Sequence, residues 1–235
     1  EETARKVLAE LCQDLNLEES VISNTTATGY GRRMVKFANS TISEISANVQ
    51  GATWYGLQNG LTIRTIFNIG GQDSKVIALY SQGVTKHFAM NDKCAAGTGR
   101  FLEMTARNLE LEVNELGTYH ERAQGVPLTI NSTCTVFAES EIISLLANGH
   151  GKEELIAGIH YSIAKRVARL AKRFGMNGAV FFDGGPAQNQ GLVQALEDEL
   201  MRQVIVPETP QITTAYGAAL LAREAYDNLG EAVNG

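Results

Sequence analysis

Residues 65–90, TIFNIGGQDSKVIALYSQGVTKHFAM, contain the clearest β-strand pattern in the chain. Glycine turns at Gly70-Gly71 and at Gly83 divide this segment into three runs in which Ile, Val and Phe recur. Runs of this kind, ending at glycine, are typical of short strands joined by tight turns. The segment therefore predicts a β-meander of two or three strands.

Helical periodicity dominates the sequence on both sides of the meander. The longest example, residues 153–174, places Leu155, Ile159 and Ile163 on one apolar stripe, which is typical of an amphipathic helix. Helices are predicted over 1–17, 99–111, 136–147, 153–174, 191–200 and 214–226, with a further candidate over 33–39. Short strands are predicted over 20–28, 179–182 and 204–206. Strands that alternate with helices after a meander indicate an α/β chain with a mixed sheet in two lobes.

The composition excludes several classes of protein. With 235 residues, 44% of them hydrophobic and 20% charged, the chain suits one large or two small globular domains. It has no apolar run near the roughly 18 residues that a membrane span needs. Three cysteines indicate reduced thiols and a cytoplasmic protein rather than a disulfide scaffold. The net charge of −6 argues against nucleic-acid binding. We therefore assign the basic stripe of residues 153–174 to a solvated face: Lys165, Arg166, Arg169, Lys172 and Arg173.

The turn at Gly70 and Gly71 is followed directly by Gln72 and Asp73. Two glycines in a turn allow backbone N–H groups to approach an anion closely, because no Cβ stands in the way. Gln72 could orient a water molecule, and Asp73 could hold the hydration shell of a magnesium ion. This turn is either part of a phosphate site or an ordinary glycine hairpin with polar residues beside it.

A second glycine turn, Asp183-Gly184-Gly185, ends the apolar run 179–182 and precedes the predicted helix 191–200. Ligands commonly bind at the carboxyl edge of a sheet, with a phosphate or ribose near a helix N-terminus. A single strand, glycine pair and helix is a weak signal, and a purely structural turn explains it equally well. Two such turns in one chain, each at the end of a strand, together favour a nucleotide cleft.

Cys94 and Cys134 each come just before a predicted helix. A helix N-terminus favours a thiolate and supplies N–H donors to sulfur, as a reactive cysteine or an iron–sulfur ligand requires. Two cysteines cannot complete the four-thiolate site of a cubane cluster, but a two-fold dimer that contributes both from each subunit can. Without a Cys-x-x-Cys motif, ordinary small residues on loops are the simpler interpretation of the spacing alone. Cys12, on the apolar side of the first helix, is assigned to packing.

Five segments carry a resemblance to a known family. They are TATGYGR (26–32), NIGGQDSK (68–75), MNDKCAAGTGRFL (90–102), STCTVFAESE (132–141) and AYGAAL (215–220). Together they resemble the activator ATPases of 2-hydroxyacyl-CoA dehydratases, to which the ATPase subunits of benzoyl-CoA reductase are closely similar. The resemblance extends from the first predicted helix to the last, and the two cysteine segments are its most specific part.

The resemblance implies a two-lobed nucleotide-binding fold of the acetate kinase, Hsp70 and actin type, which is ribonuclease H-like. Residues 1–64, with 211–228 returning to them, would form part of the first lobe, and residues 65–210 would form the second. The family begins with a strand hairpin that carries an Asp-x-Gly-Ser-type phosphate loop. The first lobe is therefore expected to be incomplete at the N-terminus of this sequence.

The resemblance also assigns residues to ATP, magnesium and an iron–sulfur cluster. Asp73 would lie near magnesium, and Gln72 would be a candidate for orienting the attacking water. Cys94 and Cys134 would hold one 4Fe–4S cluster, shared across a homodimer. The nucleotide would place its phosphates on the first turn and its adenosine on the second. The residues expected to bind it are Gly70, Gly71, Lys75, Gly184, Gly185 and Asn189.

The function implied by the resemblance is ATP-dependent electron transfer in the cytoplasm of an anaerobe. Nucleotide binding or hydrolysis would swing the two cluster helices, and one low-potential electron would pass to an iron–sulfur acyl-CoA dehydratase or reductase component. An electron donor such as ferredoxin or flavodoxin would reduce the cluster again. Neither a nucleic acid nor a membrane is expected as a partner.

Asn68 departs from the family pattern, which usually has Asp at the start of the phosphate loop. The change removes one negative charge from the expected magnesium environment. The first phosphate loop is either cut off from this sequence or absent from the protein. If it is absent, the two departures motivate a second hypothesis, a regulatory subunit without ATP turnover. A third hypothesis is a small-molecule kinase of the same superfamily, in which the cysteines would bind no cluster.

Overall fold

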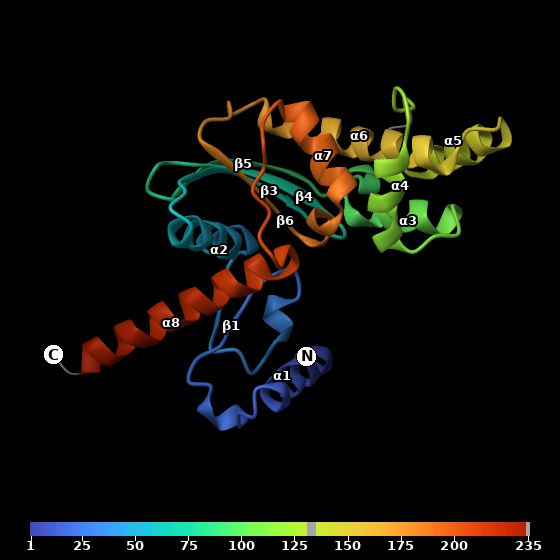
Figure 1. The fold of residues 1–235 in the computed structure, drawn as a ribbon. Coiled ribbons are helices and arrows are strands. Elements are labelled where there is room, and N and C mark those ends of the chain that lie inside the picture. The colour runs from blue at the N-terminus through green and yellow to red at the C-terminus, as the bar shows by residue number, and fades with distance from the viewer. Residues whose placement is uncertain (131–134, 234–235) are drawn as a thin grey trace. The chain divides into compact units, whose positions relative to one another are not determined.

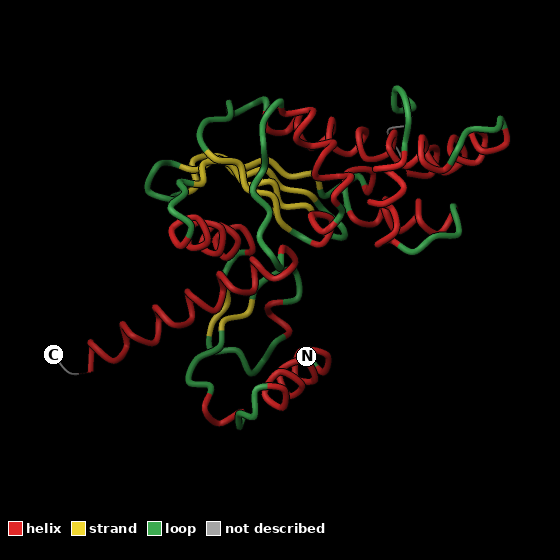
Figure 2. Tube along the Cα trace, in the orientation of Figure 1, coloured by secondary structure: helices red, strands yellow, loops and turns green. Residues whose placement is uncertain are grey.

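The computed structural model describes residues 1–130 and 135–233, and the chain divides into two compact units (Figure 1). One unit contains residues 1–58 together with the C-terminal segment that begins at Thr213. The other contains residues 59–212. The strands form a two-stranded sheet in the first unit and a four-stranded sheet in the second (Figure 2).

The first unit is built on two packed helices, α2 (Glu44–Gln58) and α8 (Thr213–Val233). They approach closely at Gly217, where an added Cβ would overlap the carbonyl oxygen of Ala47, and the rings of Trp54 and Tyr216 lie 4.6 Å apart. The remaining elements are α1 (Glu2–Asp14), the 3-10 turns η1 (Glu19–Val21) and η2 (Arg32–Met34), and the parallel strands β1 (Thr26–Ala27) and β2 (Ser40–Thr41). Cys12 on α1 is buried, in agreement with a packing role.

The sheet of the second unit has the strand order β5–β4–β3–β6. Its strands are β3 (Ile63–Ile69), β4 (Ser74–Leu79), β5 (Thr85–Asn91) and β6 (Ala179–Asp183). The first three form the predicted antiparallel meander, whereas β6 pairs with β3 in parallel. Every residue of β4 is buried, as is every residue of β3 except Arg64. Because β3 and β6 are parallel, the two glycine turns that follow them lie at the same edge of the sheet.

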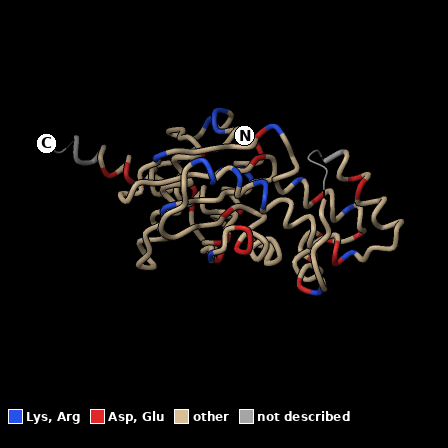
Figure 3. Tube along the Cα trace, turned by 90° about the horizontal axis from the view of Figure 1, so that it is seen from above, with Lys and Arg blue, Asp and Glu red and all other residues tan. Residues whose placement is uncertain are grey.

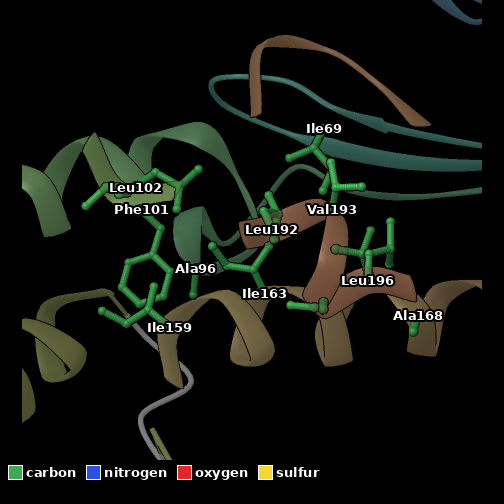
Figure 4. Close-up of a cluster of buried hydrophobic side chains, with 14 of the residues drawn as sticks. Ile69, Ala96, Phe101, Leu102, Ile159, Ile163, Ala168, Leu192, Val193 and Leu196 are labelled. Atoms are coloured by element: carbon green, nitrogen blue, oxygen red, sulfur yellow. The ribbon is translucent and has the colours of Figure 1, made fainter. Parts of the chain in front are cut away.

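The helices of the second unit pack around an apolar core. Ile159 and Ile163 on the predicted stripe are buried, and they belong to one cluster with Phe101 and Leu192 (Figure 4). The periodic helices predicted from the sequence are thereby confirmed. The helical elements of this unit are η3 (Ala95–Gly97), α3 (Gly99–Asn108), η4 (Val113–Glu115), α4 (Leu116–Arg122), α5 (Thr135–Ala147), α6 (Lys152–Ala171), η5 (Gly185–Gln188), α7 (Gln190–Leu200) and η6 (Pro210–Ile212).

Three short predicted elements are wrong. The candidate helix over 33–39 is only the 3-10 turn η2, and the strand expected over 20–28 is reduced to the two residues of β1. The strand expected over 204–206 forms a single bridge, between Ile205 and Phe181. The helix α4 has only seven residues and is absent from the predicted elements. Such short elements depend on tertiary contacts more than on local sequence, because they make too few hydrogen bonds to form alone.

Charged residues of both signs occur along the trace of both units (Figure 3). Lys165 and Arg169 on α6 are exposed, as predicted for a solvated face, but Arg166 is half-buried. Within residues 1–130 and 135–233, no helix is long and apolar enough to cross a membrane.

Candidate functional site

The first glycine turn closes between the ends of β3 and β4. The N–H group of Gly70 donates to the carbonyl oxygen of Asp73 at 2.8 Å. Gly71 and Gln72 at the tip of this turn are exposed, and an added Cβ at Gly71 would meet nothing within 4 Å. The backbone of this turn is therefore open to a ligand, as a phosphate loop requires.

Two of the predicted site residues, Asp73 and Lys75, form a buried ion pair. The Nζ atom of Lys75 lies 2.5 Å from Oδ1 of Asp73, and the two residues are only 3% and 4% exposed. In this arrangement the ammonium group neutralises the carboxylate. A magnesium ion at Asp73 would compete with Lys75 for the same oxygen.

Asn68 has a buried partner at the sheet edge. Its Nδ2 atom donates to Oδ1 of Asp183 at 2.8 Å, and both residues are buried. These residues are directly paired in the ladder between β3 and β6. The Asn68 amide therefore contributes a hydrogen bond between the two strands that carry the glycine turns.

Gly184 packs against the end of β3. It has a φ of +95°, and an added Cβ would overlap the carbonyl oxygen of Ile69. Its N–H group donates to the carbonyl oxygen of Pro210 at 2.9 Å. Only glycine adopts this conformation without strain at such a close approach, so Gly184 sets the spacing between the two turns.

The start of α3 is hydrogen-bonded to the first glycine turn. The N–H group of Gly99 donates to the carbonyl oxygen of Gly70 at 2.8 Å, and that of Arg100 donates to Gly71 at 2.9 Å. An added Cβ at Gly99 would lie 3.3 Å from Gly70, from Gly71 and from Pro186. Gly99 therefore lies where the first turn, the second turn and α3 meet.

A cavity of about 390 Å³ opens between these segments, a size typical of small-molecule sites. Gly71, Gly185 and Asn189 line it, together with Gly99, Leu102 and Glu103. The structure thus brings one residue of the predicted phosphate turn and two of the predicted adenosine residues to one cavity. Gly70 and Gly184 lie next to its lining in sequence, whereas the buried Asp73–Lys75 pair is not part of the lining.

Asn189 is held by two hydrogen bonds. It is the N-cap of α7, where its Oδ1 atom accepts from the N–H group of Leu192 at 3.1 Å. Its Nδ2 atom lies 3.0 Å from Nε2 of His160, and Nδ1 of His160 lies 3.0 Å from Nδ1 of His120. The two histidines are not among the predicted site residues, since they lie 40 residues apart on α4 and α6 without a motif that joins them.

Cys94 lies outside the first turn of α3, in contrast to the expectation from the sequence. It is the N-cap of the 3-10 turn η3 and lies five residues before Gly99. The first N–H groups of α3 donate to the glycine turn and not to sulfur. Arg166 donates to the Sγ atom of the half-buried Cys94, with its Nη1 3.7 Å away. This arginine therefore does not belong to a purely solvated face.

The remaining cysteine prediction, Cys134, lies outside the described residues. Among the residues that the structure does describe, no group of three or more His, Cys, Asp or Glu side chains could hold a metal ion. One chain therefore provides no complete metal site from its described part. A site that needs ligands from a second copy is compatible with this finding.

Sequence comparison identifies a family and close relatives. A family model described as "BadF/BadG/BcrA/BcrD ATPase family" matches residues 1–222. The chain is 50% identical over 209 residues to an activator of lactoyl-CoA dehydratase from Anaerotignum propionicum, covering 89% of this chain and 79% of that protein. It is 45% identical over 217 residues to a 2-hydroxyisocaproyl-CoA dehydratase activator from Clostridioides difficile, covering 92% of this chain and 80% of the relative.

A solved structure shares the fold. The activator of the 2-hydroxyisocaproyl-CoA dehydratase from Clostridium difficile, with bound ADPNP, superposes with a TM-score of 0.90 at 44% identity. The match covers 97% of this chain and 83% of that one. This likeness confirms the predicted mixed α/β, actin-like nucleotide-binding fold.

Proposed function

Because the chain belongs to the BadF/BadG/BcrA/BcrD ATPase family, we propose that it couples ATP hydrolysis to the transfer of one low-potential electron. The receiving partner would be a 2-hydroxyacyl-CoA dehydratase or a benzoyl-CoA reductase-type component, and a ferredoxin or flavodoxin would supply the electron. The two relatives described above are named as dehydratase activators. The observation that carries the proposal is the hydrogen-bonded link between the glycine turn and the start of α3, close in sequence to Cys94.

ATP with magnesium would occupy the cavity. The turn that Gly70 closes would receive the β- and γ-phosphates on its exposed backbone at Gly71. Gly184, Gly185 and Asn189 would lie against the adenosine. Gln72 is exposed at the tip of the turn, which suits a residue that orients water. Asp73 would contribute its carboxylate to the magnesium environment from behind the turn, and Lys75, its buried partner, would balance the charge there.

The surroundings of Cys94 fit a cluster ligand. Its sulfur is half-buried, and the Arg166 guanidinium lies within hydrogen-bond distance of it; a donor of this kind stabilises a thiolate and affects cluster potential. Cys94 and Cys134 would hold a 4Fe–4S cluster together with the same two residues of a second copy. When bound, such a cluster supplies one-electron chemistry.

Nucleotide state would reach Cys94 through the backbone. The carbonyl groups of Gly70 and Gly71 face α3, where they accept hydrogen bonds from Gly99 and Arg100. A change in the peptide planes of this turn on binding phosphate changes these acceptors, and with them the position of the start of α3. Cys94 is joined to α3 by the short turn η3 and contacts α6 through Arg166, so its position relative to Arg166 would change with the nucleotide.

The experiment that tests the proposal is Cys94→Ser, purified without oxygen. We expect a folded protein that binds ATP but has lost its iron and the visible absorption of a cluster. Cys12→Ser is the matched control, since Cys12 is buried in the first unit and should leave the iron content unchanged. Full iron content in Cys94→Ser would show that Cys94 is not a ligand, and an iron-free native protein would favour the kinase hypothesis.

A further inference from the structure

A chain of three polar side chains runs from the cavity into the core of the second unit. It begins at Asn189, which lines the cavity, passes to His160 and ends at His120. His160 is 0% exposed and His120 is 6% exposed. Buried polar groups of this kind are usually fully hydrogen-bonded, so the proton positions along the chain follow from the contacts.

The helix cap fixes the orientation of the Asn189 carboxamide. Its Oδ1 atom accepts from the N–H group of Leu192, so Nδ2 is the atom that faces His160. An amide nitrogen only donates, so Nε2 of His160 must carry a lone pair. The proton of His160 is then on Nδ1, which donates to Nδ1 of His120. A single arrangement, with both rings neutral, satisfies both of these contacts.

The packing around these residues leaves little room for another arrangement. An added Cβ at Gly191 on α7 would lie 2.5 Å from Cβ of His120 and 2.9 Å from Nδ1 of His160. An added Cβ at Gly117 on α4 would lie 3.3 Å from Oδ1 of Asn189. Two glycines therefore allow α4 and α7 to close on the histidine pair and the amide, and the dense contact holds the rings in place.

The electrostatic surroundings favour the neutral form. Burial, followed by repulsion from His120, lowers the pKa of His160 to about 3. Burial also lowers the pKa of His120, although Asp198 on α7 and Glu121 on α4 oppose this shift. Tyr161 on α6 stacks on the His120 ring and donates to Asp198. Neutral rings are required, because a doubly protonated His160 would direct a second donor at the Asn189 amide.

We propose that His160, supported by His120, is a positioning residue of the nucleotide cavity that holds the Asn189 carboxamide in one orientation toward the adenosine. The contacts to Leu192 and His160 use one lone pair and one N–H of the amide, and the second N–H and second lone pair serve the adenosine. The inference rests on the proposed nucleotide function. The affinity of the cavity for the nucleoside part of the nucleotide then depends on the Nε2 lone pair of His160.

Two variants of His160 separate its two nitrogen atoms. In His160→Gln the side-chain amide reaches the former position of Nε2 and can still accept from Asn189. In His160→Asn the amide stands near the former position of Nδ1, so it keeps the contact with His120 and loses the contact with Asn189. Tyr161→Phe is the control, because it removes one hydrogen bond on the same helix without touching Asn189.

The probes are ADP and tripolyphosphate, titrated by calorimetry into the native protein and each variant. We expect His160→Asn to bind ADP roughly tenfold more weakly, the loss of about one hydrogen bond, and to bind tripolyphosphate as the native protein does. His160→Gln and Tyr161→Phe should bind both within about twofold of native. The positioning role would be overturned if His160→Asn bound ADP as tightly as the native protein does. It would also be overturned if both His160 variants lost affinity for ADP and for tripolyphosphate to the same extent. If the native protein binds neither probe, the proposed function itself fails.

A measurement on the native protein makes the test independent of whether the variants fold. The chain has four histidines, and nitrogen NMR of histidine-labelled protein distinguishes the two neutral tautomers. We expect one ring protonated at Nδ1 with a bare Nε2 and a second ring protonated at Nε2, both unchanged between pH 6 and pH 8. Absence of an Nδ1-protonated ring would refute the inference.

Discussion

Replacing Asn68 by Asp tests the electrostatics of the sheet edge most directly. In the native protein Nδ2 of Asn68 donates to Oδ1 of Asp183 at 2.8 Å, and the two side chains are almost inaccessible to solvent. The variant would place two carboxyl groups at this distance. Like charges so close in a buried site cannot both ionise, so the pair retains one proton.

The burial of the pair gives the sign of the effect. Burial and a like charge both raise the pKa of a carboxyl group, and the shift of a fully buried group reaches about 3–5 units. A folded-state pKa above the unfolded value means that the stability of the variant falls as the pH rises above about 4. The loss is about 1.4 kcal/mol for each pH unit, or about 2.7 kcal/mol between pH 5 and pH 7.

The assay is urea unfolding of the native protein, Asn68→Asp and Asn68→Ala at pH 5, 6 and 7. Asn68→Ala removes the same hydrogen bond without adding a carboxyl group, so its difference from the native protein should change much less with pH than that of Asn68→Asp. The difference for Asn68→Asp should grow steadily over this range. A constant difference would mean that water or a cation reaches the pair, and the argument from burial would then be refuted.

Three further substitutions examine the second glycine turn and the buried ion pair. Gly184→Ala should lower the free energy of unfolding by more than about 2 kcal/mol, because it adds left-handed strain to the overlap with Ile69. Gly185→Ala, where an added Cβ meets open space, should be nearly neutral in the same denaturation curves, and equal losses in the two would disprove this explanation. Asp73→Asn leaves the ammonium group of Lys75 buried beside a neutral amide, so unfolding should cost about 3 kcal/mol less. Its affinity for ATP, measured with and without magnesium, should no longer depend on the metal, and a retained magnesium dependence would contradict the role given to this carboxylate.

Local sequence was sufficient for the elements that position the site. The alternation of apolar runs and glycine turns over 65–90 predicts the meander, and the periodicity of 153–174 predicts α6, because both patterns arise from neighbours within a few residues. The same local pattern placed a glycine turn after each of β3 and β6. The local pattern did not show that these turns share one sheet edge. That depends on the parallel pairing of Asn68 with Asp183, which are 115 residues apart.

The sequence by itself therefore determined the meander, the strand β6, the periodic helices and the two glycine turns, but not the helix α2. The tertiary structure decided which side chains act together. Arg166 belongs to a basic stripe in the sequence, but the fold brings it to Cys94, 72 residues away. In the sequence His160 is one residue of a predicted helix, with no motif around it. In the fold its Nε2 atom contacts the side-chain amide of Asn189, 29 residues away. The spacing of apolar residues indicates which face of a helix or strand is buried. It does not indicate which residues of another element pack against that face. Donor–acceptor pairing between distant elements is decided only when the elements pack.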